Sequence, residues 1–127
     1  MAMDKTTPIL IVDDYKTMVR IIRNLLQQLG FEQVDDAADG AAALAKLKER
    51  AFGLVISDWN MEPMSGLELL QQVRADPALK DLPFIMVSAE SRNDRVALAR
   101  RAGVSGYVVK PFNADTLGQQ IASVIGG

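Results

Sequence analysis

The sequence contains no cysteine and no histidine. Without cysteine there can be no disulfide, no thiolate zinc site and no cysteine nucleophile. Without histidine, a Ser-His-Asp triad and an imidazole metal site are also excluded. Any chemistry of this chain must therefore use carboxylates, hydroxyls, amides, lysine or arginine.

Long apolar runs and a strong net charge are also absent. No apolar run exceeds five residues, whereas a membrane-spanning helix needs roughly 20. Residues 1–8 are polar and contain no apolar segment of an export signal. The chain has 14 basic and 16 acidic residues, a net charge of −2, and a nucleic-acid-binding domain is usually clearly basic. We therefore expect a cytoplasmic protein that binds neither membranes nor nucleic acid.

The length and composition are those of one globular domain. The chain has 127 residues, of which 49% are hydrophobic and 24% charged, the balance of an ordinary folded protein. A disordered chain would have fewer apolar residues and a larger net charge. No long linker, repeat or low-complexity segment interrupts the sequence. We expect a single domain over residues 1–127, with no output domain attached.

Short apolar runs alternate five times with segments of helical periodicity. The apolar runs are rich in β-branched residues, as expected of strands buried on both faces, and the segments between them carry apolar side chains at helical spacing. The expected strands are 9–12, 34–37, 52–56, 84–87 and 106–109, and the expected helices are 18–29, 41–50, 67–75, 94–102 and one that ends near 125. This alternation predicts an α/β fold with a single doubly wound, five-stranded parallel sheet and five helices.

Polar residues follow four of these strands. Asp13 and Asp14 come after the first strand, Asp58 after the third, Ser88 after the fourth and Lys110 after the fifth. Ligands of open parallel sheets bind beyond the carboxyl ends of the strands. We therefore expect three carboxylates, one hydroxyl and one ammonium group in a single pocket.

Three clustered carboxylates repel one another unless a cation compensates them. Ligands that are all oxygen favour Mg²⁺, Mn²⁺ or Ca²⁺ over zinc, and a divalent ion together with Lys110 would balance the three negative charges. A carboxylate beside Mg²⁺ and a lysine can attack phosphorus and form an acyl phosphate. Asp58 is the best candidate nucleophile, because it stands alone at its strand end whereas Asp13 and Asp14 are paired.

Each of these residues also has a purely structural interpretation. The pair Asp13 and Asp14 could cap the following helix, and Asp58 could cap a turn. Ser88 could be an ordinary loop hydroxyl, and Lys110 a solvated surface charge. Only their joint placement at four strand ends favours a site.

The motifs around these residues resemble the response-regulator receiver family, in particular its CheY-like chemotaxis receivers. The matching blocks are IVDD at 11–14, ISDWNM at 56–61, GLELL at 66–70 and GYVVKPF at 106–112. The resemblance covers about residues 9–125, and these blocks in this order are specific. It implies a flavodoxin-like sheet with strand order 2-1-3-4-5.

The resemblance also implies roles for individual residues. Asp58 would accept a phosphoryl group from a histidine of a partner kinase. Asp13, Asp14, Asp58 and the backbone carbonyl of Asn60 would hold Mg²⁺, and Lys110 would contact the phosphoryl oxygens.

Further roles in the family concern switching and lifetime. Ser88 would hydrogen-bond the phosphoryl group, and Tyr107 would turn inward behind it and reshape the surface of the fourth helix, fifth strand and fifth helix. Asn60 and Glu90 occupy positions that tune the lifetime of the acyl phosphate, and a cis peptide bond would precede Pro111.

Three positions depart from the family's usual pattern. Glu62 stands where proline is usual and Pro63 follows it, which leaves the path of the loop after Asp58 open. Ser65 replaces a common aspartate, and Ser88 lacks the methyl group of threonine, so that its coupling to Tyr107 is expected to be looser.

The function implied is that of a stand-alone, monomeric phospho-receiver that switches a protein-binding face. By resemblance, its partners would be a CheA-type histidine kinase and FliM, the flagellar motor switch protein. An alternative within this class is a phosphate sink or a phosphorelay intermediate without motor contact. Arg92, Arg95, Arg100 and Arg101 of the fourth helix either form a basic partner face or are solvated.

Two other classes of protein fit the residues less well. A phosphatase of the haloacid dehalogenase type needs Asp-x-Asp after the first strand, whereas this chain has adjacent Asp13 and Asp14 followed by Tyr15. A flavodoxin-like electron carrier on the same fold would place its flavin phosphate after the first strand, where both aspartates would repel it.

Overall fold

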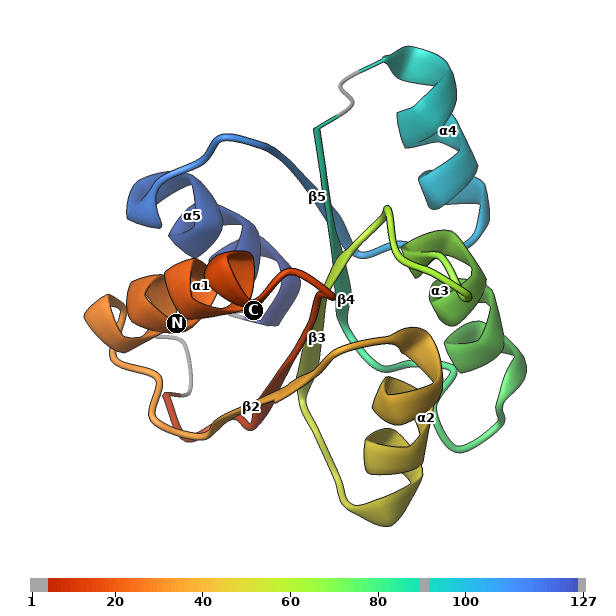
Figure 1. The fold of residues 1–127 in the computed structure, drawn as a ribbon, viewed down its shortest axis with the longest axis horizontal. Coiled ribbons are helices and arrows are strands. Elements are labelled where there is room, and N and C mark those ends of the chain that lie inside the picture. Colours follow the sequence, from red (N-terminus) through yellow and green to blue (C-terminus); the bar gives the residue numbers. More distant parts are fainter. Residues whose placement is uncertain (1–4, 90–91, 126–127) are drawn as a thin grey trace.

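In the computed structural model, described over residues 5–89 and 92–125, five parallel strands form one sheet with helices between them (Figure 1). The sheet order is β2-β1-β3-β4-β5, and every neighbouring pair is parallel. The doubly wound α/β fold and its strand order are therefore as expected. The strands are β1 (Ile9–Val12), β2 (Val34–Ala37), β3 (Leu54–Asp58), β4 (Phe84–Ser88) and β5 (Gly106–Val109), and the helices are α1 (Lys16–Gln28), α2 (Gly40–Glu49), α3 (Gly66–Ala75), α4 (Asn93–Arg101) and α5 (Ala114–Ile125).

The helices cover both faces of the sheet and create two apolar cores. Helices α1 and α5 lie side by side on one face, and α2, α3 and α4 lie on the other (Figure 1). Because side chains alternate along a strand, Ile9 and Ile11 of β1 pack under α1 and α5, whereas Leu10 and Val12 pack in the other core. Across the ranges described, no helix combines the length and apolar character needed to span a membrane.

Strand β3 lies two residues later than the sequence pattern predicts. It runs from Leu54 to Asp58 instead of 52–56. Its pairing with β1 begins at Leu54, opposite Ile9, and its pairing with β4 continues to Asp58, opposite Val87. Gly53 lies before the strand and its N–H donates to the carbonyl of Pro8 at 2.9 Å. Asp58 is thus the last residue of a strand that pairs on both sides.

Strand β2 forms one edge of the sheet and pairs only with β1. The carbonyls of Gln33 and Ala37 accept hydrogen bonds from the β1 side. Successive carbonyls of a strand point in opposite directions, so those of Val34 and Asp36 face the open side.

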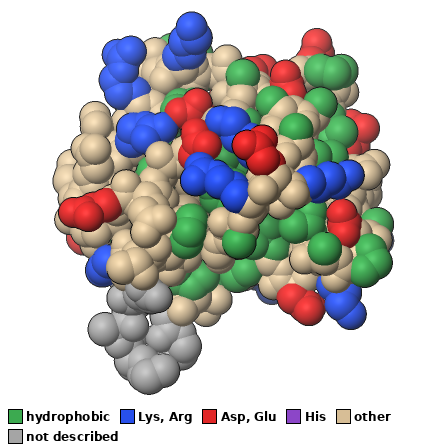
Figure 2. Space-filling model, turned by 90° about the horizontal axis from the view of Figure 1, so that it is seen from below, with side chains coloured by type: hydrophobic (Ala, Val, Ile, Leu, Met, Phe, Trp, Pro, Cys, Tyr) green, Lys and Arg blue, Asp and Glu red, His purple; other side chains and the backbone are tan. Residues whose placement is uncertain are grey.

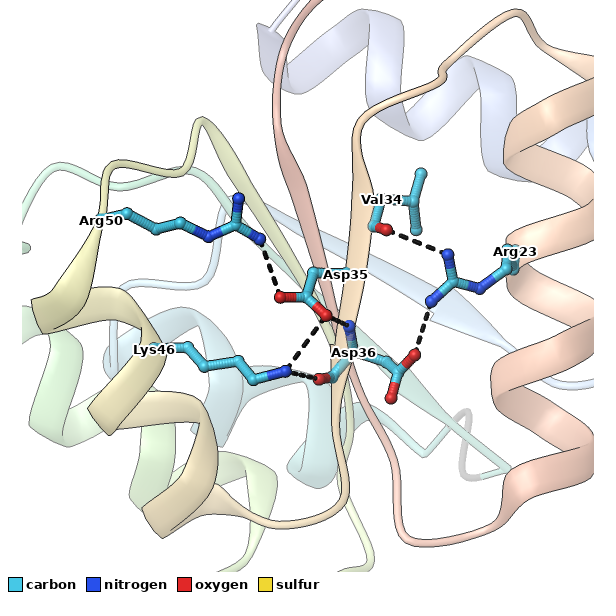
Figure 3. Close-up of polar contacts among 6 residues, drawn as sticks. All are labelled: Arg23, Val34, Asp35, Asp36, Lys46 and Arg50. Carbon is cyan, nitrogen blue, oxygen red and sulfur yellow. Dashed lines mark hydrogen bonds and ion pairs between the residues drawn. The ribbon is translucent and has the colours of Figure 1, made fainter.

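Side chains from α1 and α2 donate hydrogen bonds to the backbone carbonyls on this open side (Figure 3). Arg23 donates to the carbonyl of Val34 at 2.9 Å and to the carboxylate of Asp36. Lys46 donates to the carbonyl of Asp36, and the Asp36 N–H donates to Asp35 Oδ1 at 2.8 Å. A strand from another chain would have to displace these contacts, so the β2 edge is protected against pairing.

Basic and acidic side chains are interspersed on the face of the molecule seen from below (Figure 2). Neither sign gathers into a continuous field on this face, which agrees with the net charge of −2. Among the described residues visible on this face there is no basic stripe of the kind by which proteins neutralise a phosphate backbone.

Candidate functional site

The carboxyl ends of β1, β3 and β5 bring the acidic residues and the lysine together. One carboxylate oxygen from each of Asp13, Asp14 and Asp58 lies within 4.8 Å of the others. Lys110 Nζ lies 2.9 Å from Asp58 Oδ1, and the Lys110 N–H donates to the carbonyl of Ser88 at 2.8 Å. Residues that are 97 positions apart in the sequence (110 minus 13) therefore share one small rim, and Ser88 is buried beside it.

Asp58 and the residue after it are held in place by hydrogen bonds to their backbone groups. The Ser57 hydroxyl donates to the Asp58 carbonyl at 3.0 Å. The Trp59 N–H donates to the carbonyl of Val87 at 3.0 Å, and the Gly66 N–H donates to the carbonyl of Trp59 at 2.8 Å. Asp58 as a residue is only 7% exposed, so its carboxylate is presented at a fixed position with Lys110 as its cationic partner.

Asp13 is the most deeply buried carboxylate of the cluster. Burial raises its pKa to about 6, with smaller upward contributions from Asp58 and Asp14, while the Tyr15 N–H and the charge of Lys110 lower it. Its Oδ1 accepts from the Tyr15 N–H at 2.9 Å. Within residues 5–89 and 92–125, its Oδ2 is buried without a hydrogen-bond partner.

This unpartnered oxygen is a direct test of whether the cluster fits a cation. A buried carboxylate oxygen without a donor is costly, and a divalent ion shared with Asp14 and Asp58 would satisfy it. The donors are all oxygen, since the chain has no histidine or cysteine, which suits Mg²⁺, Mn²⁺ or Ca²⁺. The residues present fit a hard divalent cation.

The capping interpretation of the acidic pair is wrong. Helix α1 begins at Lys16 and its N-cap residue is Tyr15, which makes no side-chain capping bond. Asp14 is exposed, and it lines an open pocket with Asn60 and Glu62. The two aspartates therefore face the rim and do not cap the helix.

Ser65 has a structural role that the sequence analysis missed. Its hydroxyl accepts from the Glu68 N–H at 3.1 Å, and the Glu68 carboxylate accepts from the Ser65 N–H at 3.2 Å, which forms a capping box at the start of α3. The pattern Ser-x-x-Glu before an apolar segment is a known signature of such a box and could have been found. Ser65, which stands where the resemblance implies an aspartate, is thus the N-cap residue of α3.

Of the remaining expected residues, Tyr107 contacts the loop that follows Asp58. Tyr107 is half-buried, and its ring meets the Trp59 ring edge to face with centroids 6.4 Å apart. The peptide bonds before Pro63 and Pro111 are both cis, as expected for Pro111. Glu90, to which the family resemblance gives a role in acyl-phosphate lifetime, lies outside the described residues.

The four arginines of the α4 segment do not share one environment. Arg92, Arg100 and Arg101 are exposed, whereas Arg95 is half-buried and donates to Asn60 Oδ1 at 3.0 Å. No sequence signal indicates this contact, because the two residues are separated by 35 positions and neither belongs to an apolar pattern. Arg95 therefore belongs with the site and not with an exposed basic face.

Known proteins match this chain in sequence and in fold over nearly its whole length. A family model described as the response regulator receiver domain matches residues 9–122. The chemotaxis protein CheY-3 of Vibrio cholerae is 47% identical over 122 residues, 96% of this chain and 94% of that protein. The chemotaxis protein CheY of Pseudomonas aeruginosa is 51% identical over 116 residues, 91% and 94% of the two chains. The solved structure of Vibrio cholerae CheY4 covers 94% of this chain and 98% of its own, with a TM-score of 0.87 at 35% identity.

Proposed function

The chain belongs to the family of response regulator receiver domains, and we propose that it is a chemotaxis regulator switched by phosphorylation of Asp58. The observation that carries this proposal is the placement of the Asp58 carboxylate. It is almost buried at the end of β3, 2.9 Å from Lys110 Nζ and next to the carboxylates of Asp13 and Asp14. This is the arrangement that phosphoryl transfer to a carboxylate requires.

A magnesium ion would be held by Asp13, Asp14, Asp58 and the backbone carbonyl of Asn60. When bound, it would supply positive charge against the oxygens of the transferring phosphoryl group. The buried, unpartnered Oδ2 of Asp13 supports this assignment. No histidine or cysteine is present to favour another metal.

The phosphoryl donor would be a phosphohistidine of a CheA-type kinase. An oxygen of the Asp58 carboxylate attacks phosphorus as the bond from phosphorus to the histidine nitrogen breaks, and the imidazole leaves. Lys110, which pairs with Asp58 before the reaction, then contacts the phosphoryl oxygens. The absence of histidine from this chain is consistent with a receiver and not a donor.

The output would be a change of the surface formed by α4, β5 and α5. In this proposal Ser88 hydrogen-bonds the phosphoryl group, and Tyr107 turns inward behind it. The edge contact between Tyr107 and Trp59 supports a coupling of β5 to the loop that follows Asp58. Asn60 and Glu90 would set the lifetime of the acyl phosphate, and the partner would be FliM, with a phosphate sink or relay as the alternative.

Fluorescence of the single tryptophan tests the phosphorylation step, because Trp59 adjoins Asp58. We expect a saturable response to Mg²⁺ and then a second, reversible response to acetyl phosphate, in which acetate leaves as Asp58 takes the phosphoryl group. Asp58→Asn should lose the second response, and intact mass should show one phosphoryl group on the wild type alone. An equal acetyl phosphate response in both proteins would contradict the proposal. Steady hydrolysis of small phosphate esters would instead point to a phosphatase.

A pull-down with FliM tests the partner separately. We expect retention of the protein to rise severalfold when a phosphoryl mimic such as beryllofluoride is added with Mg²⁺, since the mimic should switch the α4, β5 and α5 surface. Asp58→Asn should not respond to the mimic. Equal binding in both states would remove the motor-switch function and favour the phosphate sink or relay.

A further inference from the structure

Arg95 reaches from the first turn of α4 to the loop that follows Asp58. Its Nη2 donates to Asn60 Oδ1 at 3.0 Å. Its guanidinium carbon lies 4.1 Å from the centroid of the Trp59 ring, a close cation–π contact. In the part of the chain that the structure describes, its Nε is buried without a hydrogen-bond partner, so the guanidinium lies against the ring and not in open solvent. Arg95 thus contacts both residues that follow Asp58.

The Arg95 contact determines which way the Asn60 amide is turned. A guanidinium has only donors, so Asn60 must present its carbonyl oxygen to Arg95. The NH₂ end of the same amide is then the end available to other groups. Asn60 lies two residues after Asp58 and lines the open pocket that also contains Asp14 and Glu62. If Arg95 were replaced, the Asn60 amide would lose the contact that selects this orientation.

Arg95 also holds α4 and the Trp59 side chain together. Ala99 is the one buried residue within α4, and Leu98 is 45% exposed, so the helix has little apolar contact with the sheet. Trp59 is only 6% exposed although it lies in a loop, with Arg95 against its ring and Tyr107 at its edge. The Arg95 contacts therefore fix the position of Trp59 and Asn60 at the rim.

We propose that Arg95 is a positioning residue that slows hydrolysis of the acyl phosphate on Asp58. This inference rests on the proposed function and assigns a residue that regulates the same site. In the hydrolysis, a water oxygen bonds to phosphorus as the bond between phosphorus and the Asp58 oxygen breaks. The Asp58 carboxylate is restored, and inorganic phosphate leaves with the protons of the water. By holding Trp59 and Asn60 in place, Arg95 restricts the approach of that water.

The test compares Arg95→Ala with Arg95→Lys and with a control, Arg101→Ala. Arg101 is an exposed arginine in the last turn of the same helix, so its removal matches the change of charge. Each protein is phosphorylated with acetyl phosphate and Mg²⁺, transferred to buffer without the donor, and followed by the release of inorganic phosphate. We expect the first-order rate to rise about threefold or more in Arg95→Ala, because Trp59 and Asn60 lose the contacts that restrict the approach of water, and a change of this size is what one hydrogen bond is worth. Arg95→Lys should lie between Arg95→Ala and the wild type, and Arg101→Ala should match the wild type.

A double-mutant cycle separates positioning of Asn60 from a general loosening of the fold. In an Asn60→Ala background, replacement of Arg95 should change the hydrolysis rate much less than it does in the wild type. A merely structural role of Arg95 would instead accelerate hydrolysis equally in both backgrounds. That outcome would overturn the inference.

The two proposals fail in different ways. If none of the proteins incorporates a phosphoryl group, the proposed function is wrong, and with it the role of Arg95. If all incorporate it and lose it at the same rate, phosphorylation stands and the role of Arg95 is wrong. Thermal unfolding of each variant identifies a variant that fails to fold, in which case Arg95→Lys provides the decisive comparison with the wild type.

Discussion

Replacement of Asp13 by asparagine is expected to stabilise the fold and to abolish magnesium-dependent phosphorylation. Burial raises the pKa of Asp13 from 3.8 to about 6, so the folded state disfavours the charged form that the unfolded state accepts. Each pKa unit corresponds to about 1.4 kcal/mol, and the variant should therefore gain about 2–3 kcal/mol at pH 8. Asparagine retains the oxygen that accepts from the Tyr15 N–H.

The pH dependence follows from the direction of the shift. Well above pH 6 the Asp13 carboxylate is charged in both the folded and the unfolded state, and its full cost is present. As the pH falls from 6 towards 3.8, the folded state takes up the proton before the unfolded state does, and the cost declines. The advantage of the asparagine variant should therefore be about half as large at pH 5 as at pH 8.

Urea unfolding without divalent ions, at pH 8 and at pH 5, measures this difference. Asp14→Asn is the matched control, because Asp14 is adjacent and exposed, and its change should be below about 0.5 kcal/mol. Addition of Mg²⁺ should stabilise the wild type and leave Asp13→Asn almost unchanged. A gain in stability of equal size at both pH values would show that the buried charge of Asp13 is not its cause.

The destabilising charge of Asp13 is what a metal site of this kind requires. The same burial that raises its pKa leaves its Oδ2 without a donor, so a cation is the partner that satisfies it. Sites of function often retain such unfavourable groups at the expense of stability. The expected gain in stability and loss of phosphorylation would thus have a single origin.

The convergence of Asp13, Asp58 and Lys110 could be predicted because it depends on regular features. Continuous β-branched runs predict buried parallel strands, and parallel strands place their carboxyl ends at one edge. Residues at or just after the end of each run then lie at that edge whatever the exact bounds of the strand, which is why the two-residue error in β3 did not displace Asp58. Regular periodicity was sufficient for these side chains.

The contacts of Arg95 could not be predicted in the same way. They depend on where a mostly polar helix lies on the sheet, and α4 has only Ala99 buried within it. No periodic pattern in the sequence predicts the hydrogen bond to Asn60 or the cation–π contact with Trp59. The unpartnered Oδ2 of Asp13 is likewise a property of the folded rim, because it depends on the burial of one atom.

Gly66→Ala is expected to destabilise the fold by about 2–4 kcal/mol and to displace Asp58. Gly66 is the first residue of α3, and its N–H donates to the carbonyl of Trp59. A Cβ at this position would lie 2.2 Å from the Asp58 carbonyl oxygen and 2.9 Å from Trp59 Cα, both backbone atoms, and 2.9 Å from Met86 Sδ. The methionine can move, but the backbone can give way only if the end of β3 shifts.

Gly118→Ala is the matched control, since Gly118 is also a buried helical glycine. There the added Cβ would meet only side-chain atoms of Leu29, the nearest at 3.1 Å, and alanine favours a helix over glycine by about 1 kcal/mol. We expect this variant to equal or exceed the wild type in urea unfolding. Comparable stability of the two variants would show that the end of β3 tolerates displacement.

The same pair of variants tests whether phosphorylation depends on the fixed position of Asp58. At a temperature where Gly66→Ala is still folded, its rate of phosphorylation by acetyl phosphate should fall about tenfold or more, because a misplacement of a reacting group by about 1 Å can cost on the order of a hundredfold. Gly118 lies in α5 on the opposite face of the sheet, against Leu29, so Gly118→Ala should retain the wild-type rate. A destabilised but fully reactive Gly66→Ala would mean that α3 supports the fold without positioning Asp58. A Gly66→Ala variant that is folded but reacts slowly would show that the start of α3 positions the Asp58 carboxylate for attack on phosphorus.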